Sequence, residues 1–169
     1  IFDSLLLCCF PSHLTRAINQ AESDNVNARL IASRTHTLRD LAAYGERYGI
    51  DYRFPAQRRK TVEVPVLHGR IHELEPGPGM QLVASDIEVL QRYDSRSHRP
   101  APLSIIVMLE GHAQITLGSE RLDFAAGTAL SVRLSEHEGL QAVQPPNQRI
   151  RALTLALDAP RLADALGGK

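Results

Sequence analysis

Histidines and two neighbouring acidic residues are the side chains that could bind a metal ion or move a proton. His68 and His72 lie four residues apart, which suits two ligands on one face of a helix. Their segment has the pattern of a strand, however, where these side chains share a face but stand too far apart to chelate one ion well. The other set is His98, His137 and Glu138, because a divalent ion needs about three converging protein ligands. We expect these three to be solvated loop residues.

No other catalytic signature is present. The sequence contains no Gly-x-Ser-x-Gly, no phosphate-binding glycine loop and no dinucleotide fingerprint. Cys8 and Cys9 are adjacent, a spacing that strains a disulfide between them, and there is no Cys-x-x-Cys for zinc. Glu136 and Glu138 lie in a polar stretch, where solvated surface is the default. The residue types therefore predict neither a reaction centre nor a cofactor.

The composition is that of a soluble globular protein. The chain of 169 residues is 43% hydrophobic and 22% charged, and its 19 basic and 19 acidic residues cancel. A nucleic-acid-binding surface usually carries net positive charge, so we expect none here. The apolar run 5–10 is too short to span a bilayer and is not preceded by the basic residues of a signal peptide. We expect a cytoplasmic protein with no membrane contact.

The first 60 residues have helical patterns. A first amphipathic stripe is formed by Leu14, Ala17, Ile18 and Ala21, at spacings of three and four. A second helix is predicted over 38–48: Thr37 with Asp40 resembles a capping box, and Gly49 is placed to end it. Residues 55–61 form a polar, basic linker whose three successive cations are best explained by solvation. We therefore expect residues 1–60 to be a helical segment and linker.

From residue 61 the hydrophobic period changes to that of strands. Short runs rich in Val, Ile and Leu alternate with Gly and Pro, and we expect strands near 66–74, 81–92, 103–109, 113–117, 120–124, 129–134, 140–143 and 150–157. Two prolines make 75–79 a turn or loop, and 94–102 reads as a polar loop. Many short, evenly spaced strands favour a barrel or sandwich over 61–158. Residues 159–169 then begin a helix, with Pro160 in its first turn.

The segment 106–132 resembles the cupin family. A strand ending in Glu110-Gly111 is followed by a second strand, a turn at Gly118, a third strand and then Gly127. The resemblance covers about 27 residues by spacing, and the strand rhythm extends it over roughly 90. It implies a mainly β fold: a cupin-like antiparallel β-barrel (double-stranded β-helix) with an N-terminal helical segment and a short C-terminal helix.

Many cupins are metalloenzymes, and the resemblance identifies where their ligands would lie. The family places a Glu seven residues before the glycine of the bend, and this chain has Ser104 there. Two His would fall at 97 and 99, which are Ser97 and Arg99, or at 98 and 100, which are His98 and Pro100.

The third His of the family falls at Glu138, one residue past His137. The ligand set is therefore not present, and we expect a barrel without metal. With a shift of one residue in the alignment, His98, His137 and Glu138 remain an alternative metal site.

A barrel without metal ligands still has an interior that can hold a small molecule. We expect six residues to contact it: Ile106, Met108, Gln114, Thr116, Arg133 and Arg151. The methionine adapts to ligand shape, and the arginines could meet a carboxylate or a metal-chelate anion. The alternative for each arginine is a solvated surface position.

A cupin-like barrel that lacks the metal ligands and leads into a helix is similar to the N-terminal sensor domain of AraC-type transcription regulators. The residues Pro78-Gly79-Met80 look most like the branch that responds to siderophores. The resemblance implies an effector-binding domain, a homodimer, and DNA contact only through a C-terminal domain absent from this chain. The alternatives are a small metal-dependent cupin enzyme, such as an isomerase or dioxygenase, and a structural dimerisation domain with a solid interior.

Overall fold

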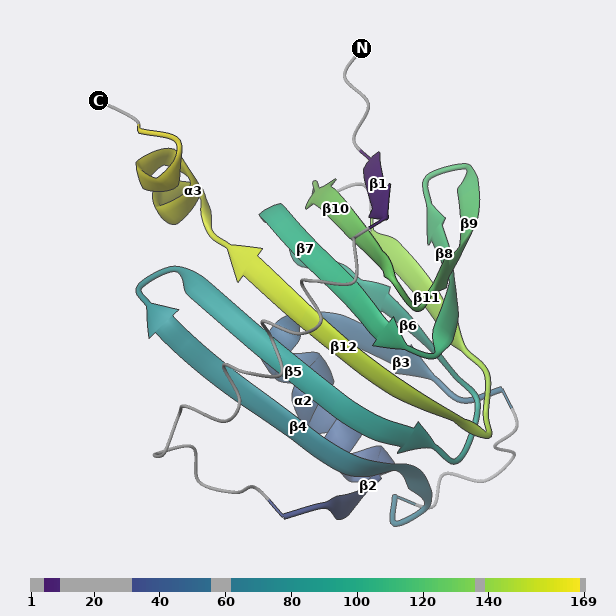
Figure 1. Ribbon diagram of the computed structural model, residues 1–169. Coiled ribbons are helices and arrows are strands. Elements are labelled where there is room, and N and C mark those ends of the chain that lie inside the picture. The colour runs from purple at the N-terminus through teal and green to yellow at the C-terminus, as the bar shows by residue number, and fades with distance from the viewer. Residues whose placement is uncertain (1–4, 10–31, 56–61, 136–138, 168–169) are drawn as a thin grey trace.

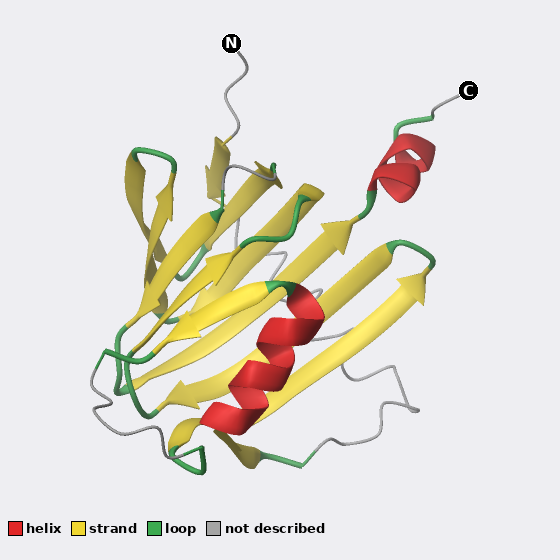
Figure 2. Cartoon of the chain, turned by 180° about the vertical axis from the view of Figure 1, so that it is seen from behind, coloured by secondary structure: helices red, strands yellow, loops and turns green. Residues whose placement is uncertain are grey.

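The computed structural model of the chain describes residues 5–9, 32–55, 62–135 and 139–167. Two antiparallel β-sheets face each other, and one helix lies across the open side between them (Figures 1 and 2). The first amphipathic stripe predicted from the sequence, over 14–21, and most of the basic linker lie outside the described residues. Neither helix of the described chain has the length and apolarity that a membrane crossing requires.

The larger sheet has seven strands. In spatial order they are β1 (Leu5–Cys9), β10 (Thr128–Leu134), β7 (Ala101–Glu110), β12 (Gln148–Leu157), β5 (Met80–Val89), β4 (Pro65–Gly77) and β2 (Arg34–Thr37). The long central strands alternate apolar residues that face the second sheet with residues that face outward. The helix α3 (Ala159–Ala165) follows β12 directly and contacts β7.

The smaller sheet has five strands. Their order is β3 (Ile50–Arg53), β6 (Tyr93–Ser97), β11 (Leu140–Gln144), β8 (His112–Leu117) and β9 (Glu120–Ala125). The turn at Gly111 brings β7 of the first sheet into β8 of the second. Gly111 has a φ of 88°, and a Cβ there would lie 2.5 Å from the carbonyl oxygen of Arg149, so this corner requires glycine.

The hydrophobic core fills the space between the sheets. Its most deeply buried side chains, each at most 2% exposed, are Leu41, Val66, Val89, Ile115, Phe124, Leu130 and Val132. They come from both sheets and from the helix α2 (Leu38–Tyr48). Burial of apolar surface is the main stabilising contribution, about 1.5–3 kcal/mol for each fully buried side chain of this size.

The helix α2 has the bounds and the capping that the sequence predicts. Thr37 is its N-cap, Asp40 completes the capping box, and Gly49 ends it in the left-handed conformation at φ 66°. Gly45 lies so close to β3 that a Cβ would be 2.4 Å from the carbonyl oxygen of Ile50. This close approach lets the helix and the strand that follows it pack as a tight hairpin.

All eight predicted strands are confirmed, but four others were not predicted. β1, β2, β3 and β6 are short or polar, and β1, β2 and β3 lie within the segment expected to be helical and linker. The prediction of a loop over 94–102 was wrong at both ends, because β6, which pairs with β3 and β11, continues to Ser97 and β7 begins at Ala101. The prediction of a turn over 75–79 was also partly wrong, since β4 continues to Gly77. Pro76 is tolerated because β2 pairs with β4 only as far as Gly69, so within the described residues β4 is an edge strand beyond it.

Candidate functional site

A cavity of about 870 Å³ lies between the sheets, beside α2. This volume is within the range of pockets that hold small organic molecules, about 300–1,000 Å³. Its walls come from α2, from the inward faces of β3, β4, β5, β6, β7 and β12, and from the turn between β4 and β5. Aliphatic wall residues include Leu41, Leu67, Ile71, Val83 and Ile87.

Four tyrosines form the aromatic part of the wall. Tyr44 and Tyr48 are one turn apart on α2 and stack with ring centres 6.5 Å apart, whereas Tyr52 of β3 and Tyr93 of β6 meet at a tilt, 5.9 Å apart. Burial raises the pKa of Tyr48 and of Tyr52 to about 12, so both hydroxyls stay protonated near neutral pH. The wall therefore offers neutral, flat surfaces for an aromatic or apolar ligand.

Tyr48 also brings a buried polar atom. Its hydroxyl is buried and forms no hydrogen bond of standard geometry within the described part of the chain, but Arg47 and Glu73, which pair with each other, lie close enough to shift its pKa. A polar group on a bound molecule would give this hydroxyl a partner of better geometry.

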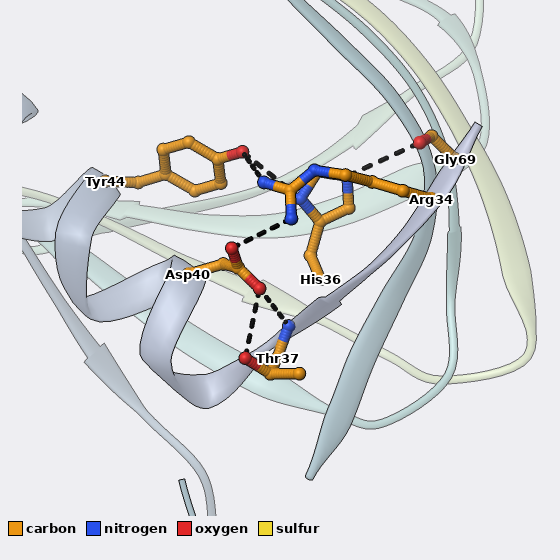
Figure 3. A network of polar contacts seen from close by, with 6 residues as sticks. All are labelled: Arg34, His36, Thr37, Asp40, Tyr44 and Gly69. Atoms are coloured by element: carbon orange, nitrogen blue, oxygen red, sulfur yellow. Dashed lines mark hydrogen bonds and ion pairs between the residues drawn. The ribbon is translucent and has the colours of Figure 1, made fainter. Parts of the chain in front are cut away.

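The hydroxyl of Tyr44 already has hydrogen-bond partners, in a network behind the cavity wall (Figure 3). It lies 3.1 Å from Nδ1 of the buried His36 and accepts a hydrogen bond of 3.2 Å from Nη2 of Arg34. Arg34 in turn pairs with Asp40, whose second oxygen accepts from the Thr37 N–H at 2.8 Å. The capping residue of α2 and a cavity tyrosine are thus held by one set of contacts.

Three of the four positions where a cupin enzyme would carry metal ligands, under the first alignment, line this cavity, and the fourth, Glu138, lies outside the described residues. Ser97 lies at the end of β6 and Ser104 within β7, while Arg99 lies in the segment between these strands. Tyr93 and Ser97 share the inward face of β6, so His98 turns outward. It is exposed and its Nδ1 lies 3.5 Å from a carboxylate oxygen of Asp51. The other alignment, with His98 as a ligand, does not fit this orientation.

Arg99 lies at the C-terminal end of α2. A Cβ on Gly49 would lie 2.6 Å from Cβ of Arg99 and 3.3 Å from its Nε, so the side chain covers the last turn of the helix. The carbonyl groups there carry partial negative charge, which favours a cation. Arg99 is exposed, so it brings a positive charge to the rim of the cavity.

Ile106 and Met108, two of the six residues that we expected to contact a ligand, point to the interior. They belong to the same face of β7 as Ser104; Met108 is buried in the core and Ile106 packs against it. The cavity ends before it reaches them.

The other four expected contact residues do not line the cavity either. Gln114 and Thr116 are on the outward face of β8, since Ala113 and Ile115 are the buried residues there. Arg133 is exposed on β10, and Arg151 lies on the outward face of β12, opposite Asp86 and Glu110 on the adjacent strands. Their role as ligand contacts stays a prediction.

No three His, Cys, Asp or Glu side chains of the described chain are grouped so that they could hold a metal ion. His137 and Glu138, which the sequence suggested as members of such a site, lie outside the described residues.

The tyrosine wall was not predicted from the sequence. The spacing of Tyr44 and Tyr48 on a predicted helix was a usable signal, because residues four apart share one face. Tyr52 and Tyr93 lie on strands that were not predicted, so the sequence offered no reason to bring them together.

Comparison with known proteins supports the fold. The profile of a family described as "Regulatory protein PchR N-terminal domain" matches residues 68–169. The AraC-like transcriptional activator CuxR is similar in structure, with a TM-score of 0.53 at 10% identity, over 80% of this chain and 51% of that one. The chain thus spans about half the length of that activator.

Two cupin structures are also similar. A Cupin 2 conserved barrel domain protein from Salinispora arenicola CNS-205 has a TM-score of 0.41 at 18% identity, over 59% of this chain and 84% of that one. The cupin domain of Schizosaccharomyces pombe Cnp3 has a TM-score of 0.45 at 11% identity, over 67% and 77%. No curated protein sequence matches the chain. The predicted fold class, mainly β with antiparallel sheets, is confirmed by the arrangement of the strands, although the two sheets do not close into a barrel within the described residues.

Proposed function

Since the chain belongs to the family of PchR N-terminal regulatory domains of AraC-type regulators, we propose that it is a sensor that binds a small effector in the cavity between its sheets. One observation carries the proposal. Three of the four positions at which the cupin resemblance would place metal ligands, Ser97, Arg99 and Ser104, line the cavity of about 870 Å³ between the sheets. A cupin-like fold with these residues in place of ligands and a cavity beside them is suited to binding rather than to metal chemistry. A purely structural domain would have no need of this space.

The wall chemistry supports an effector with a flat or apolar body and at least one polar group. The tyrosine rings would contact the body, and the buried Tyr48 hydroxyl, which has no hydrogen bond of standard geometry in the described chain, would bond to the polar group. Arg99 at the rim would meet a carboxylate or a chelate anion. A siderophore or another small organic acid, as the sequence resemblance implied, has these features.

The regulatory part of the proposal concerns the whole parent protein. Effector binding would bias the arrangement of the elements that flank the barrel, by an amount limited to the difference in effector affinity between the two arrangements. The parent would act in the cytoplasm as a homodimer, and it would contact DNA through a separate C-terminal domain. The similarity to an AraC-like activator over about half of that protein supports this arrangement.

Thermal unfolding with a panel of aromatic acids, hydroxy acids and siderophores tests the proposal. A ligand at about 100 times its Kd stabilises the native state by about 2.7 kcal/mol, which raises the Tm by roughly 5–10 °C for a domain of this size. Titration calorimetry then measures the affinity of each positive compound. A complete panel that leaves the Tm unchanged contradicts the proposal.

Two matched pairs of variants locate the binding site. The phenylalanine of Ser104→Phe would project into the cavity, whereas that of Gln114→Phe would lie on the outward face of β8. Only the first should abolish binding. Arg99→Ala should weaken an acidic ligand about tenfold by removing a charged hydrogen bond, whereas Arg133→Ala, on β10, should not. If Gln114→Phe and Arg133→Ala weaken binding instead, the site lies at the residues expected from the sequence.

Elemental analysis of protein purified without chelators distinguishes the sensor from a metal-dependent enzyme. About one equivalent of iron, nickel, manganese or zinc per chain, retained through dialysis, would favour the enzyme. His137→Ala should then reduce that content if the alternative ligand set is used.

A further inference from the structure

One end of the cavity is lined by the turn between β4 and β5 together with the start of α3. Gly77, Pro78 and Gly79 form this turn, and both the turn and Asp158 belong to the cavity wall. The backbone N–H of Asp158 donates a hydrogen bond of 2.9 Å to the carbonyl oxygen of Gly79. A molecule in this end of the cavity would touch both sides of the contact.

Gly79 lies against Asp158 and leaves no space for a side chain at position 79. Its φ is 70°, a conformation that side chains disfavour, and a Cβ there would lie only 2.3 Å from Oδ1 of Asp158. Any displacement of the turn toward α3 therefore pushes directly on this carboxylate.

Asp158 is also the N-cap of α3. Its Oδ1 accepts a hydrogen bond of 2.9 Å from the backbone N–H of Arg161, and Pro160 occupies the first turn. The helix has seven residues, none of them buried, so little else than this cap and its contact with β7 stabilises it. Helices this short are not stable by themselves.

We infer that the contact between Gly79 and Asp158 is the joint through which the end wall of the cavity controls α3. The inference rests on the proposed function, because the effector is what would move the turn. With the turn in its present position the carboxylate has room to cap α3, and a turn displaced toward α3 would push the carboxylate out of its capping position. α3 is the element that continues the chain away from the barrel (Figure 1), so its order is what a neighbouring domain would detect.

The joint can be tested in the ligand-free chain by NMR. Gly79→Ala introduces the methyl group that collides with Asp158 and should shift the helix–coil ratio of residues 159–165 toward coil by about fivefold, the effect of losing one N-cap. Backbone ¹³Cα chemical shifts measure this ratio. Gly118→Ala is the matched control: Gly118 also lies in a hairpin turn, with φ 58°, but nothing is within 4 Å of its Cβ position. It should leave α3 unchanged.

A variant on the other side of the contact, Asp158→Ala, tests the same inference if Gly79→Ala does not fold. Asp158→Ala should alter the amide shifts and speed the hydrogen exchange of residues 77–80, because coupling acts equally in both directions. Asp164→Ala, in the same helix but outside the joint, should not. If neither Gly79→Ala disturbs α3 nor Asp158→Ala disturbs the turn, the inference is overturned, whatever the ligand panel shows. A joint that behaves as expected with no ligand found would count against the proposed function alone.

Discussion

Nδ1 of the buried His36 lies 3.1 Å from the hydroxyl oxygen of Tyr44, which lines the cavity. The other ring nitrogen, Nε2, lies 3.4 Å from the carbonyl oxygen of Gly69, which can only accept, so Nε2 carries the hydrogen of the neutral ring. Nδ1 then accepts the hydrogen of the Tyr44 hydroxyl, whose oxygen accepts from Arg34. His36 thereby fixes both α2 and a wall residue of the cavity to β4.

The stability of the protein should fall in mild acid because of His36. Burial, reinforced by the nearby charge of Arg34, lowers its pKa below the usual 6.5, although the Gly69 carbonyl and Asp40 act in the other direction. His68 adds a further small repulsion. The unfolded chain therefore takes up the proton first, so stability is complete above pH 6.5 and decreases as pH falls below it, by at most about 1.4 kcal/mol per pH unit. The decrease ends below the pKa of the folded state.

Urea unfolding at several pH values between 7.5 and 4.5 measures this dependence. The control is His36→Gln, which keeps a polar side chain but does not titrate. The difference in pH dependence between the two proteins isolates His36 from the exposed histidines. If the free energy of unfolding depends on pH in the same way in both proteins, the loss of stability in mild acid is not due to His36.

Tyr44→Phe should destabilise the protein by about 1–3 kcal/mol, since it leaves Nδ1 of the buried His36 without its donor. It should also raise the pKa of His36, because protonated Nδ1 no longer faces a hydroxyl hydrogen. Histidine ring NMR shifts report the pKa. Tyr52→Phe serves as the control, since Tyr52 is a cavity tyrosine outside this network.

Asp40→Ala should cost about 1–2 kcal/mol of stability. Burial alone would raise the pKa of Asp40, but the hydrogen bonds from Thr37 and Arg34 outweigh it and hold the pKa below its usual value. The variant removes the capping box and the partner of Arg34 together. Glu46→Ala, at an exposed position of the same helix, should be nearly neutral in denaturant unfolding.

Asp86 should account for part of the acid unfolding below pH 4. Hydrogen bonds from Arg149 at 2.8 and 3.0 Å, together with Arg70, lower its pKa from 3.8 to about 2 despite partial burial. Its contribution is therefore present above pH 4 and is lost as pH falls toward 2. Because both arginines are half-exposed, we expect about 1–2 kcal/mol. Asp86→Asn should flatten the stability profile between pH 4 and 2, and Asp123→Asn, exposed on β9, should not.

The sequence could predict those features that depend on neighbours along the chain. Strand alternation, the glycine turns and the capping box of α2 are local, and the structure confirms each of them. The replaced ligand positions at Ser97, Arg99 and Ser104 were also countable from Gly111. Short polar strands such as β6 were not predictable, because pairing with β3 and β11 supplies their hydrogen bonds regardless of composition.

The sequence by itself determined the mainly β, cupin-like class of the fold, since this follows from the resemblance carried by strand rhythm and glycine spacing. Only the tertiary structure decided which residues surround the interior space. Packing of α2 against β2 and β3 brings Tyr44, Tyr48 and Tyr52 to the cavity, while Gln114 and Arg133, which we expected there, face outward. The physical reason is that a shift of one residue reverses the face of a strand, and buried neighbours on the opposing sheet select the face.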